Sequence, residues 1–420
     1  SCQAVIDYAD RYAKLALEMA EKCTDPQRKA ELLVIASNCS KVPAKGATNF
    51  WEACQSFWFV QQLLQMESSG HSISPGRFDQ YMYPYYKKDI VSGALDDGQV
   101  LELLECLRIK IMQFNFVNGG AQQRDKWAGM ARWHNFVIGG VKKDGTDATN
   151  ELSYLVIQAA YEVRIPQYTI TVRVAKSTPH SLMMKAAELV ATGMGMPAFV
   201  SDESYISGLV AQGVPLEEAR DYALAGCLDL NLPGKSRINA LGMFIVPKVL
   251  DITMHNGVLT QTGEQLGPRT GEMKDFRTYE DFLNAFKTQL KYFMGLYNEE
   301  HNILIMATRY TFCDVVHSAF AYEGIKSGRD IQNRKMYYEN ASMFNPIGMI
   351  NVANSLAAVK KLVFEDKAFT MQELYQAIQA NWQGYEDMRR MCLQAPKFGN
   401  NDPFVDEIAA QLYDFWLETT

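Results

Sequence analysis

The sequence predicts an α/β fold, with a barrel or a large sheet inside and helices outside. Three short segments that are rich in β-branched or aromatic residues and bounded by Gly or Pro have the character of strands: residues 134–139, 167–174 and 197–200. Helical patterns at 148–163 and 179–192 separate them. Strands that alternate with helices are typical of α/β proteins. With 420 residues, 48% of them hydrophobic, the chain can enclose a large core, and we expect one unit.

The N-terminal part of the chain is predicted to be helical. Apolar residues recur at helical spacing from residue 4 to about 40, and the turn-like Thr24-Asp25-Pro26 divides this pattern into two helices. Residues 49–66 give a third pattern with many large apolar side chains, which is typical of a helix buried on more than one side. Helical spacing returns at 97–114.

The C-terminal half is also predicted to be mostly helical, over residues 279–306, 313–327, 355–364 and 371–394. One short apolar segment, 346–352, is predicted to be a further strand. Proline and glycine are spread evenly along the chain, so the sequence predicts no domain boundary.

Composition excludes several kinds of partner. The 41 basic and 48 acidic residues give a net charge of -7 without a basic run, which argues against nucleic-acid binding. The eight cysteines form no C-x-x-C pair and the six histidines have no ligand spacing, so we expect free thiols in a reducing compartment and no metal site. No apolar run approaches the roughly 18 residues of a membrane helix, and the N-terminus has no signal-peptide pattern. We expect a cytoplasmic enzyme. We also expect the chain to be part of a longer one, because it does not begin with methionine and helical spacing is already present at residue 4.

Cys227 differs from the other seven cysteines. Those lie in helical patterns or beside large apolar residues, where we expect buried, inert thiols. Cys227 lies between Gly226 and Gly234, which suit a sharp backbone bend or a close approach to a ligand. The residues alone leave three interpretations open: a structural loop, a nucleophile with a histidine base, and one-electron chemistry through a thiyl radical. A metal ligand would lack partners.

Five blocks of sequence carry a resemblance to a known family: residues 74–84 (SPGRFDQYMYP), 147–154 (DATNELSY), 226–229 (GCLD), 351–358 (NVANSLAA) and 396–402 (PKFGNND). In these blocks and in their order, the chain resembles the glycyl radical enzymes of the pyruvate formate-lyase superfamily. The resemblance implies one catalytic domain over residues 1–420, the central part of a longer protein. It also implies a ten-stranded barrel of two five-stranded half-barrels wrapped by helices, here incomplete.

The resemblance further implies the source of the radical. In the family, an activating enzyme with an iron-sulfur cluster and S-adenosylmethionine removes hydrogen from a C-terminal glycine, and the radical passes to a cysteine, here Cys227, which abstracts hydrogen from the substrate. The family's Arg-Val-x-Gly motif is missing, since residues 173–176 begin similarly but lack the glycine. We therefore expect the N-terminal helices and the radical domain to lie outside this sequence. We expect the 420 residues alone to be inactive, with no bound cofactor, and the protein to be a homodimer from an anaerobic bacterium.

Asp229 indicates the branch of the family. It stands where dehydratases and related eliminating members carry a glutamate that handles a substrate proton, and a carboxylate in a dry pocket can accept one. Gly226 replaces the second cysteine of pyruvate formate-lyase, which disfavours acyl transfer.

Four residues are predicted to contact substrate. Thr169 aligns, by resemblance, with a small hydroxyl residue that touches a substrate carboxylate, and Gln122 follows a Gly-Gly pair at the expected substrate mouth. Met243 belongs to a largely apolar stretch after the cysteine, and Asn345 stands where a hydroxyphenylacetate-converting member has a glutamate. An apolar stretch offers few partners to a polyol and favours an aromatic substrate.

The sequence therefore predicts a radical lyase that eliminates water or another leaving group. An arylacetate decarboxylase of the same superfamily is the alternative. A non-catalytic scaffold in which Cys227 is inert is the alternative of another class.

Overall fold

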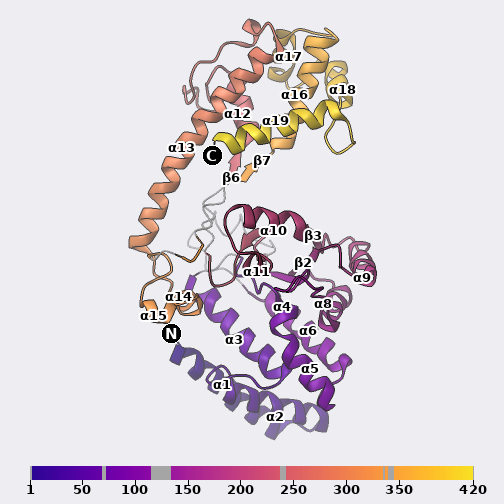
Figure 1. Cartoon of the computed structure of the whole chain (residues 1–420), viewed down its shortest axis with the longest axis vertical. Coiled ribbons are helices and arrows are strands. Elements are labelled where there is room, and N and C mark those ends of the chain that lie inside the picture. Colours follow the sequence, from indigo (N-terminus) through magenta and orange to yellow (C-terminus); the bar gives the residue numbers. More distant parts are fainter. Residues whose placement is uncertain are drawn as a thin grey trace. The chain divides into compact units, whose positions relative to one another are not determined.

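The structure, a computed structural model, describes residues 2–68, 72–114, 134–236, 243–333, 336–338 and 345–419. It divides into two compact units, which we describe separately (Figure 1). The first unit contains residues 1–238 and 312–341, and the second contains residues 239–311 and 342–420. A single catalytic domain over residues 1–420 stays a prediction.

The first unit has helices on both sides of its longest sheet. Its helices are α1 (Cys2–Lys22), α2 (Pro26–Lys41), α3 (Phe50–Ser68), α4 (Phe78–Tyr81), α5 (Tyr83–Ser92), α6 (Asp97–Met112), α8 (Glu151–Glu162), α9 (His180–Val190), α10 (Asp202–Ala211), α11 (Leu216–Ala219), α14 (Val315–Phe320) and α15 (Gly324–Ser327). Its strands are β1 (Asn135–Gly139), β2 (Thr169–Val174), β3 (Ala198–Ser201), β4 (Ala223–Ala225) and β5 (Asp229–Asn231).

The second unit is mostly helical around one short sheet. Its elements are β6 (Met243–Ile245), α12 (Val246–Met254), the 3₁₀ helix η1 (Met273–Asp275), α13 (Tyr279–Thr311), β7 (Asn345–Ile347), α16 (Met349–Val359), the π-helical η2 (Lys360–Glu365), α17 (Met371–Gln379), α18 (Glu386–Gln394) and α19 (Pro403–Thr419). Its core packs α12, α13, α16, η2 and α19 together.

The mixed α/β class is confirmed, and so are the three strands predicted in the first half of the chain, which pair in parallel. Over the described residues, the strands form the parallel sheet β1-β2-β3, the antiparallel pair β4-β5 and the parallel pair β6-β7. Residue 76 bridges to β1 and extends the first sheet by one short contact. The ten-stranded barrel stays a prediction.

The two faces of the sheet β1-β2-β3 bury different side chains. Phe136, Ile138, Ile170 and Val172 join a core with α3, α6, α8 and α9, elements that Figure 1 shows within this unit. Val137, on the other face, joins a core with α10, α11 and the β4-β5 hairpin. Because side chains alternate along a strand, this second face also carries the polar residues of β2.

Local sequence explains where several helices begin. Asp25 caps α2 by accepting hydrogen bonds from two amides of its first turn, directly before Pro26. Asp96 with Gln99 and Asn150 with Ser153 form capping boxes at the starts of α6 and α8. These caps confirm the predicted helix starts near residues 25 and 97, and they fix the one near 150.

Three predictions for the C-terminal half are wrong in part. The strand predicted over 346–352 ends at Ile347, because Gly348, at a φ of 79°, leads directly into α16. The helix predicted over 313–327 is broken into α14 and α15, and that over 371–394 into α17 and α18. No helix in the described ranges is both long and apolar enough to cross a membrane.

Candidate active site

Cys227 lies in a three-residue loop at the tip of the β4-β5 hairpin. The last pair of the hairpin joins Ala225 to Asp229, so the loop consists of residues 226–228. Gly226 has a φ of 57°, a conformation that glycine adopts without steric cost. A Cβ atom there would lie 3.2 Å from the Ser72 side chain and 3.1 Å from Asp229 Oδ2. One side of the loop is therefore closely packed, while the Cys227 side chain on it is exposed.

Hydrogen bonds hold the loop backbone on both sides of the cysteine. The Gly226 N–H donates to Ser74 Oγ at 2.9 Å. The Asn135 side-chain amide donates to the Cys227 carbonyl oxygen at 3.2 Å. Both partners belong to the sheet region, since Asn135 begins β1 and residue 76 bridges to β1. The sheet thus fixes the loop that carries the thiol.

The surroundings of the loop favour the neutral forms of its two titratable groups. Partial burial, followed by the charge of Asp229, raises the pKa of the Cys227 thiol. Burial also raises the pKa of Asp229. Burial and then the charge of Asp229 raise the pKa of Tyr205, whose ring stacks on Tyr222 with centroids 5.3 Å apart.

These pKa shifts bear on the choice between a nucleophilic Cys227 and one that acts through one-electron chemistry. A nucleophilic cysteine works as its thiolate, and reactive thiolates have lowered pKa values. A raised pKa keeps the Cys227 sulfur protonated, with an S–H bond that can exchange a hydrogen atom. The environment of the loop therefore favours one-electron chemistry over nucleophilic attack.

The other seven cysteines are less uniform than we expected. All eight thiols are free. Cys39 and Cys54 are buried, and burial raises the pKa of Cys39 to about 11. The expectation of buried thiols is wrong for Cys2, Cys106 and Cys313, which are exposed. Exposure alone therefore does not distinguish Cys227, whereas its place in a clamped hairpin loop does.

Thr169 lies close to the cysteine loop. As the first residue of β2 it pairs across the strands with Asn135, whose side chain bonds the Cys227 carbonyl. Its side chain alternates onto the face that carries Thr171 and packs toward the hairpin. Its hydroxyl oxygen is buried and has no hydrogen-bond partner among the residues that the structure describes, as is also true of both amide atoms of Gln167. An unsatisfied buried hydroxyl is costly unless a ligand or water completes it, which suits the predicted substrate contact.

Two of the remaining predicted contacts belong to the second unit. Met243 and Asn345 are direct cross-strand neighbours of the β6-β7 pair in the second unit. Met243 is 67% exposed, and Ile245 and Ile347 on the same strands are also exposed, while Phe244 between them is buried. These two strands thus present a largely apolar face with one amide. Gln122 lies outside the described residues.

The predicted site residues did not include Ser74, Asn135 and Thr171, which the structure places at the cysteine loop. Thr171 Oγ1 donates to Asn135 Oδ1 at 2.9 Å. A signal was present in β2, where Thr169, Thr171 and Arg173 alternate with Ile170, Val172 and Val174. Polar residues at every second position of a buried strand indicate one face that makes specific hydrogen bonds.

Sequence blocks that carry the family resemblance contact one another. In the first unit, block 74–84 meets block 147–154, because Asp79 Oδ2 accepts from Ser153 Oγ at 2.6 Å and Gln80 donates to the Ala148 carbonyl at 2.8 Å. In the second unit, the Phe398 N–H donates to Asn354 Oδ1 at 2.8 Å, which joins blocks 351–358 and 396–402. The blocks therefore form a few connected clusters rather than scattered matches.

Comparison with known proteins decides the family. A family model described as pyruvate formate lyase-like matches residues 1–420. The chain belongs to the pyruvate formate lyase-like family. This confirms the resemblance predicted from the five blocks.

Three relatives of this pyruvate formate lyase-like chain are informative. Isethionate sulfite-lyase of Desulfovibrio desulfuricans is 36% identical over 419 residues, which cover 98% of this chain and 50% of the relative. A solved structure from a study of 1,2-propanediol dehydration in Roseburia inulinivorans is 40% identical with a TM-score of 0.91, covering 100% of this chain and 53% of that one. Indoleacetate decarboxylase of Tractidigestivibacter scatoligenes is 31% identical over 452 residues, covering 100% of this chain and 50% of the relative. The chain spans about half the length of the curated relatives it matches.

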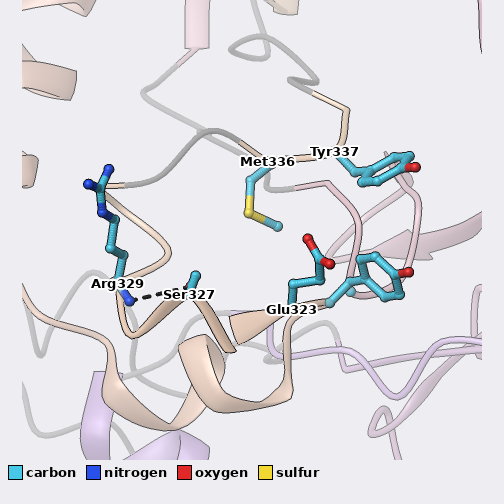
Figure 2. A pocket seen from close by; sticks show the side chains of 7 residues that line it. Glu323, Ser327, Arg329, Met336 and Tyr337 are labelled. Atoms are coloured by element: carbon cyan, nitrogen blue, oxygen red, sulfur yellow. Dashed lines mark hydrogen bonds between the residues drawn. The ribbon is translucent and has the colours of Figure 1, made fainter. Parts of the chain in front are cut away.

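A pocket of about 320 Å³ in the first unit of this family member lies away from the cysteine loop. Its lining residues are Gly234, Tyr322, Glu323, Ser327, Arg329, Met336 and Tyr337. Figure 2 shows Arg329 on one side and Tyr337 on the other, with Met336 between them. None of the predicted site residues within the described ranges lines it, so the pocket does not enter the proposed function.

Proposed function

We propose that this chain forms the catalytic portion of a glycyl radical lyase that eliminates water or another leaving group from a small hydroxylated substrate. Cys227 is the hydrogen-abstracting residue, and Asp229 is the adjacent acid-base group. One observation carries the proposal: a free, exposed thiol stands at the tip of a clamped hairpin, with a partly buried carboxylate two residues away.

The reaction uses one hydrogen atom twice. The Cys227 thiyl radical takes a hydrogen atom from the substrate carbon that carries a hydroxyl group. This step leaves a radical on that carbon and an S–H bond on Cys227. Asp229 accepts the hydroxyl proton, and the leaving group departs from the neighbouring carbon with its bonding electron pair. The proton then passes from Asp229 to the leaving group. The product radical recovers a hydrogen atom from Cys227, so the products are a carbonyl compound and the protonated leaving group.

Several parts of the whole enzyme belong to the same proposal. A glycine outside the 420 residues supplies the radical, because the sequence contains no Arg-Val-x-Gly motif. A radical S-adenosylmethionine iron-sulfur enzyme installs that radical. The strands of this chain contribute to a ten-stranded barrel within one catalytic domain, in a cytoplasmic homodimer.

Elimination is favoured over decarboxylation, which is the second candidate. A sulfite-lyase is 36% identical and the structure from the dehydration study is 40% identical, compared with 31% for a decarboxylase. The second candidate is supported by the exposed apolar face of β6-β7, which carries the predicted contacts Met243 and Asn345. Such a face can make apolar contacts with an aromatic ring, whereas it offers few hydrogen-bond partners to the hydroxyl groups of a polyol.

A substrate panel tests the proposal. The full-length protein is activated anaerobically, its glycyl radical is quantified by electron paramagnetic resonance, and it is supplied with isethionate, 1,2-propanediol, trans-4-hydroxyproline or an arylacetate. From at least one hydroxylated substrate we expect the released leaving group together with a carbonyl product, or with an imine in the case of trans-4-hydroxyproline, whose only hydroxyl group is the leaving group. Release of carbon dioxide from the arylacetate alone would overturn elimination in favour of the decarboxylase. A full radical signal without turnover of any substrate would favour a non-catalytic scaffold.

Replacing Asp229 is expected to slow the elimination. In Asp229→Asn the group can no longer accept a proton, and loss of one general base typically costs about 10²–10⁴-fold in kcat. Because burial raises the pKa of Asp229 above its usual range, the activity of the unchanged enzyme is expected to fall as the pH drops through that raised value. The measurement is the pH profile of kcat/KM, from which Asp229→Asn is expected to lose this acidic limb.

Two further variants sharpen this test. Asp229→Glu restores a carboxylate of the kind found in eliminating relatives, and is expected to retain the acidic limb. Asp10→Asn, on the exposed surface of α1, is the matched control and should leave the profile unchanged. An Asp229→Asn enzyme with the rate and profile of the unchanged enzyme would remove the acid-base role.

A further inference from the structure

Three polar side chains from neighbouring segments of the sheet region form one connected hydrogen-bond network at the cysteine loop. Ser74 lies two residues before the bridge to β1, Asn135 begins β1, and Thr171 lies within β2. Asn135 and Thr171 are completely or almost completely buried, at 0% and 1% exposure. Their contacts are fixed by a rigid sheet, which is the arrangement that holds a reactive group most precisely in place.

The network leaves only one orientation for the Asn135 amide. The Cys227 carbonyl oxygen can only accept, so the Asn135 NH₂ group must face it at 3.2 Å. Asn135 Oδ1 then faces Thr171 Oγ1 at 2.9 Å, and the Thr171 hydroxyl must be the donor. The Cys227 carbonyl therefore sets the orientation of the Asn135 side chain, and the hydrogen bond from Thr171 holds the side chain in that orientation.

Ser74 clamps the other side of the cysteine. Its hydroxyl oxygen accepts from the Gly226 N–H at 2.9 Å and from the Asn135 N–H at 3.0 Å, and it donates to the Ser72 carbonyl at 3.0 Å. A single hydroxyl thus joins the cysteine loop, the start of β1 and the preceding segment. The peptide between residues 225 and 226 and the peptide between residues 227 and 228 are both tied to β1.

We propose that Asn135, held in place by Thr171, and Ser74 are positioning residues that set the place of the Cys227 sulfur for hydrogen transfer. This inference rests on the proposed function of Cys227. Hydrogen transfer requires the sulfur and the substrate carbon in near contact, and a displacement of about 1 Å can cost about 10²-fold in rate. The network holds the 225–226 and 227–228 peptides, one on each side of the cysteine, through their backbone atoms.

The decisive variant is Thr171→Val, which keeps the shape of the side chain and removes the hydroxyl donor. In the activated full-length enzyme, kcat is expected to fall at least about 10-fold, with KM and the yield of glycyl radical little changed. Thr171→Ser keeps the donor and is expected to restore kcat. Ser74→Ala, which removes the clamp on Gly226, is expected to behave as Thr171→Val does.

A second measurement does not depend on turnover. Backbone hydrogen exchange of the peptide over residues 223–231 is expected to be faster in Thr171→Val and Ser74→Ala than in the unchanged protein, and normal in Thr171→Ser. Ser153→Ala is the matched control, because its hydroxyl is also buried in this unit but donates to Asp79 instead. It is expected to leave both kcat and exchange at 223–231 unchanged.

The outcomes separate this inference from the proposed function. If Thr171→Val turns over and exchanges as the unchanged protein does, the positioning role is overturned while the lyase proposal stands. If Thr171→Ser is as slow as Thr171→Val, the hydroxyl is not the cause and the role is overturned as well. If the unchanged protein shows no turnover, the proposed function fails. The exchange rates at 223–231 then still decide whether the network fixes the loop.

Discussion

Cys227→Ser in the activated full-length enzyme is expected to lose more than about 10³-fold in turnover while its glycyl radical signal persists. An O–H bond holds its hydrogen more tightly than an S–H bond, so serine cannot relay a hydrogen atom between the glycine and the substrate. The substitution is nearly isosteric. The hydrogen bond that the Asn135 amide donates to the Cys227 carbonyl oxygen does not involve the sulfur. The measurements are steady-state turnover and radical quantification on the same sample.

An exposed thiol elsewhere in the same unit provides the control for this variant. Cys106 on α6 is exposed, and Cys106→Ser is expected to turn over at the unchanged rate. Substantial turnover by Cys227→Ser would exclude the thiyl role and with it the proposed mechanism. Loss of turnover in Cys106→Ser as well would indicate a general effect of thiol replacement rather than a role for Cys227.

The parallel strands were predictable because their local signals were strong. Residues 134–139, 167–174 and 197–200 are rich in β-branched or aromatic residues between Gly or Pro, and each coincides with a strand of β1-β2-β3 to within two residues at either end. The β4-β5 hairpin was not predictable in this way. Its strands, Ala223–Ala225 and Asp229–Asn231, have three residues each and no β-branched residue. Contacts to Ser74 and Asn135 stabilise it, and such contacts are invisible to propensity.

The candidate site could be proposed from the sequence where the argument depended on single residues and not where it depended on partners. Cys227 and Asp229 were proposed from a glycine-bracketed loop and a recognised block of sequence, and their roles stay predictions. Asn135 was not found, because its importance comes from a partner 92 positions away in the chain. Arg173 was noted only as the start of an incomplete radical motif, and the structure gives it a different environment.

Arg173 is a completely buried cation whose partners are all in place. Its Nε lies 2.7 Å from Asp202 Oδ1 and its Nη2 lies 3.0 Å from Asp202 Oδ2, a bidentate pair. The guanidinium also donates to the carbonyl oxygens of Tyr222 and Arg220, and its central carbon lies 3.8 Å from the centre of the Tyr222 ring. Gly140 leaves room for the pair, because a Cβ there would come within 2.6 Å of Arg173 Nε.

Removing this arginine is expected to be the most destabilising single change in the first unit among those considered. Arg173→Met keeps much of the apolar stem but leaves the buried carboxylate of Asp202 without its cation. Breaking a buried ion pair in this way typically costs about 3–5 kcal/mol of unfolding free energy. The measurement is chemical unfolding, followed with a probe of the first unit such as hydrogen exchange of β2.

A second substitution distinguishes loss of the ion pair from loss of packing. Adding Asp202→Asn to Arg173→Met removes the uncompensated charge, while the new amide oxygen can still accept from the Val141 N–H or the Tyr222 hydroxyl, as the carboxylate does. The double variant is therefore expected to be more stable than Arg173→Met alone. The nearby exposed pair of Lys176 and Glu203, 3.7 Å apart, is the matched control, and Lys176→Met is expected to cost less than about 1 kcal/mol. If the double variant were less stable than Arg173→Met, packing rather than charge would account for the role of Arg173.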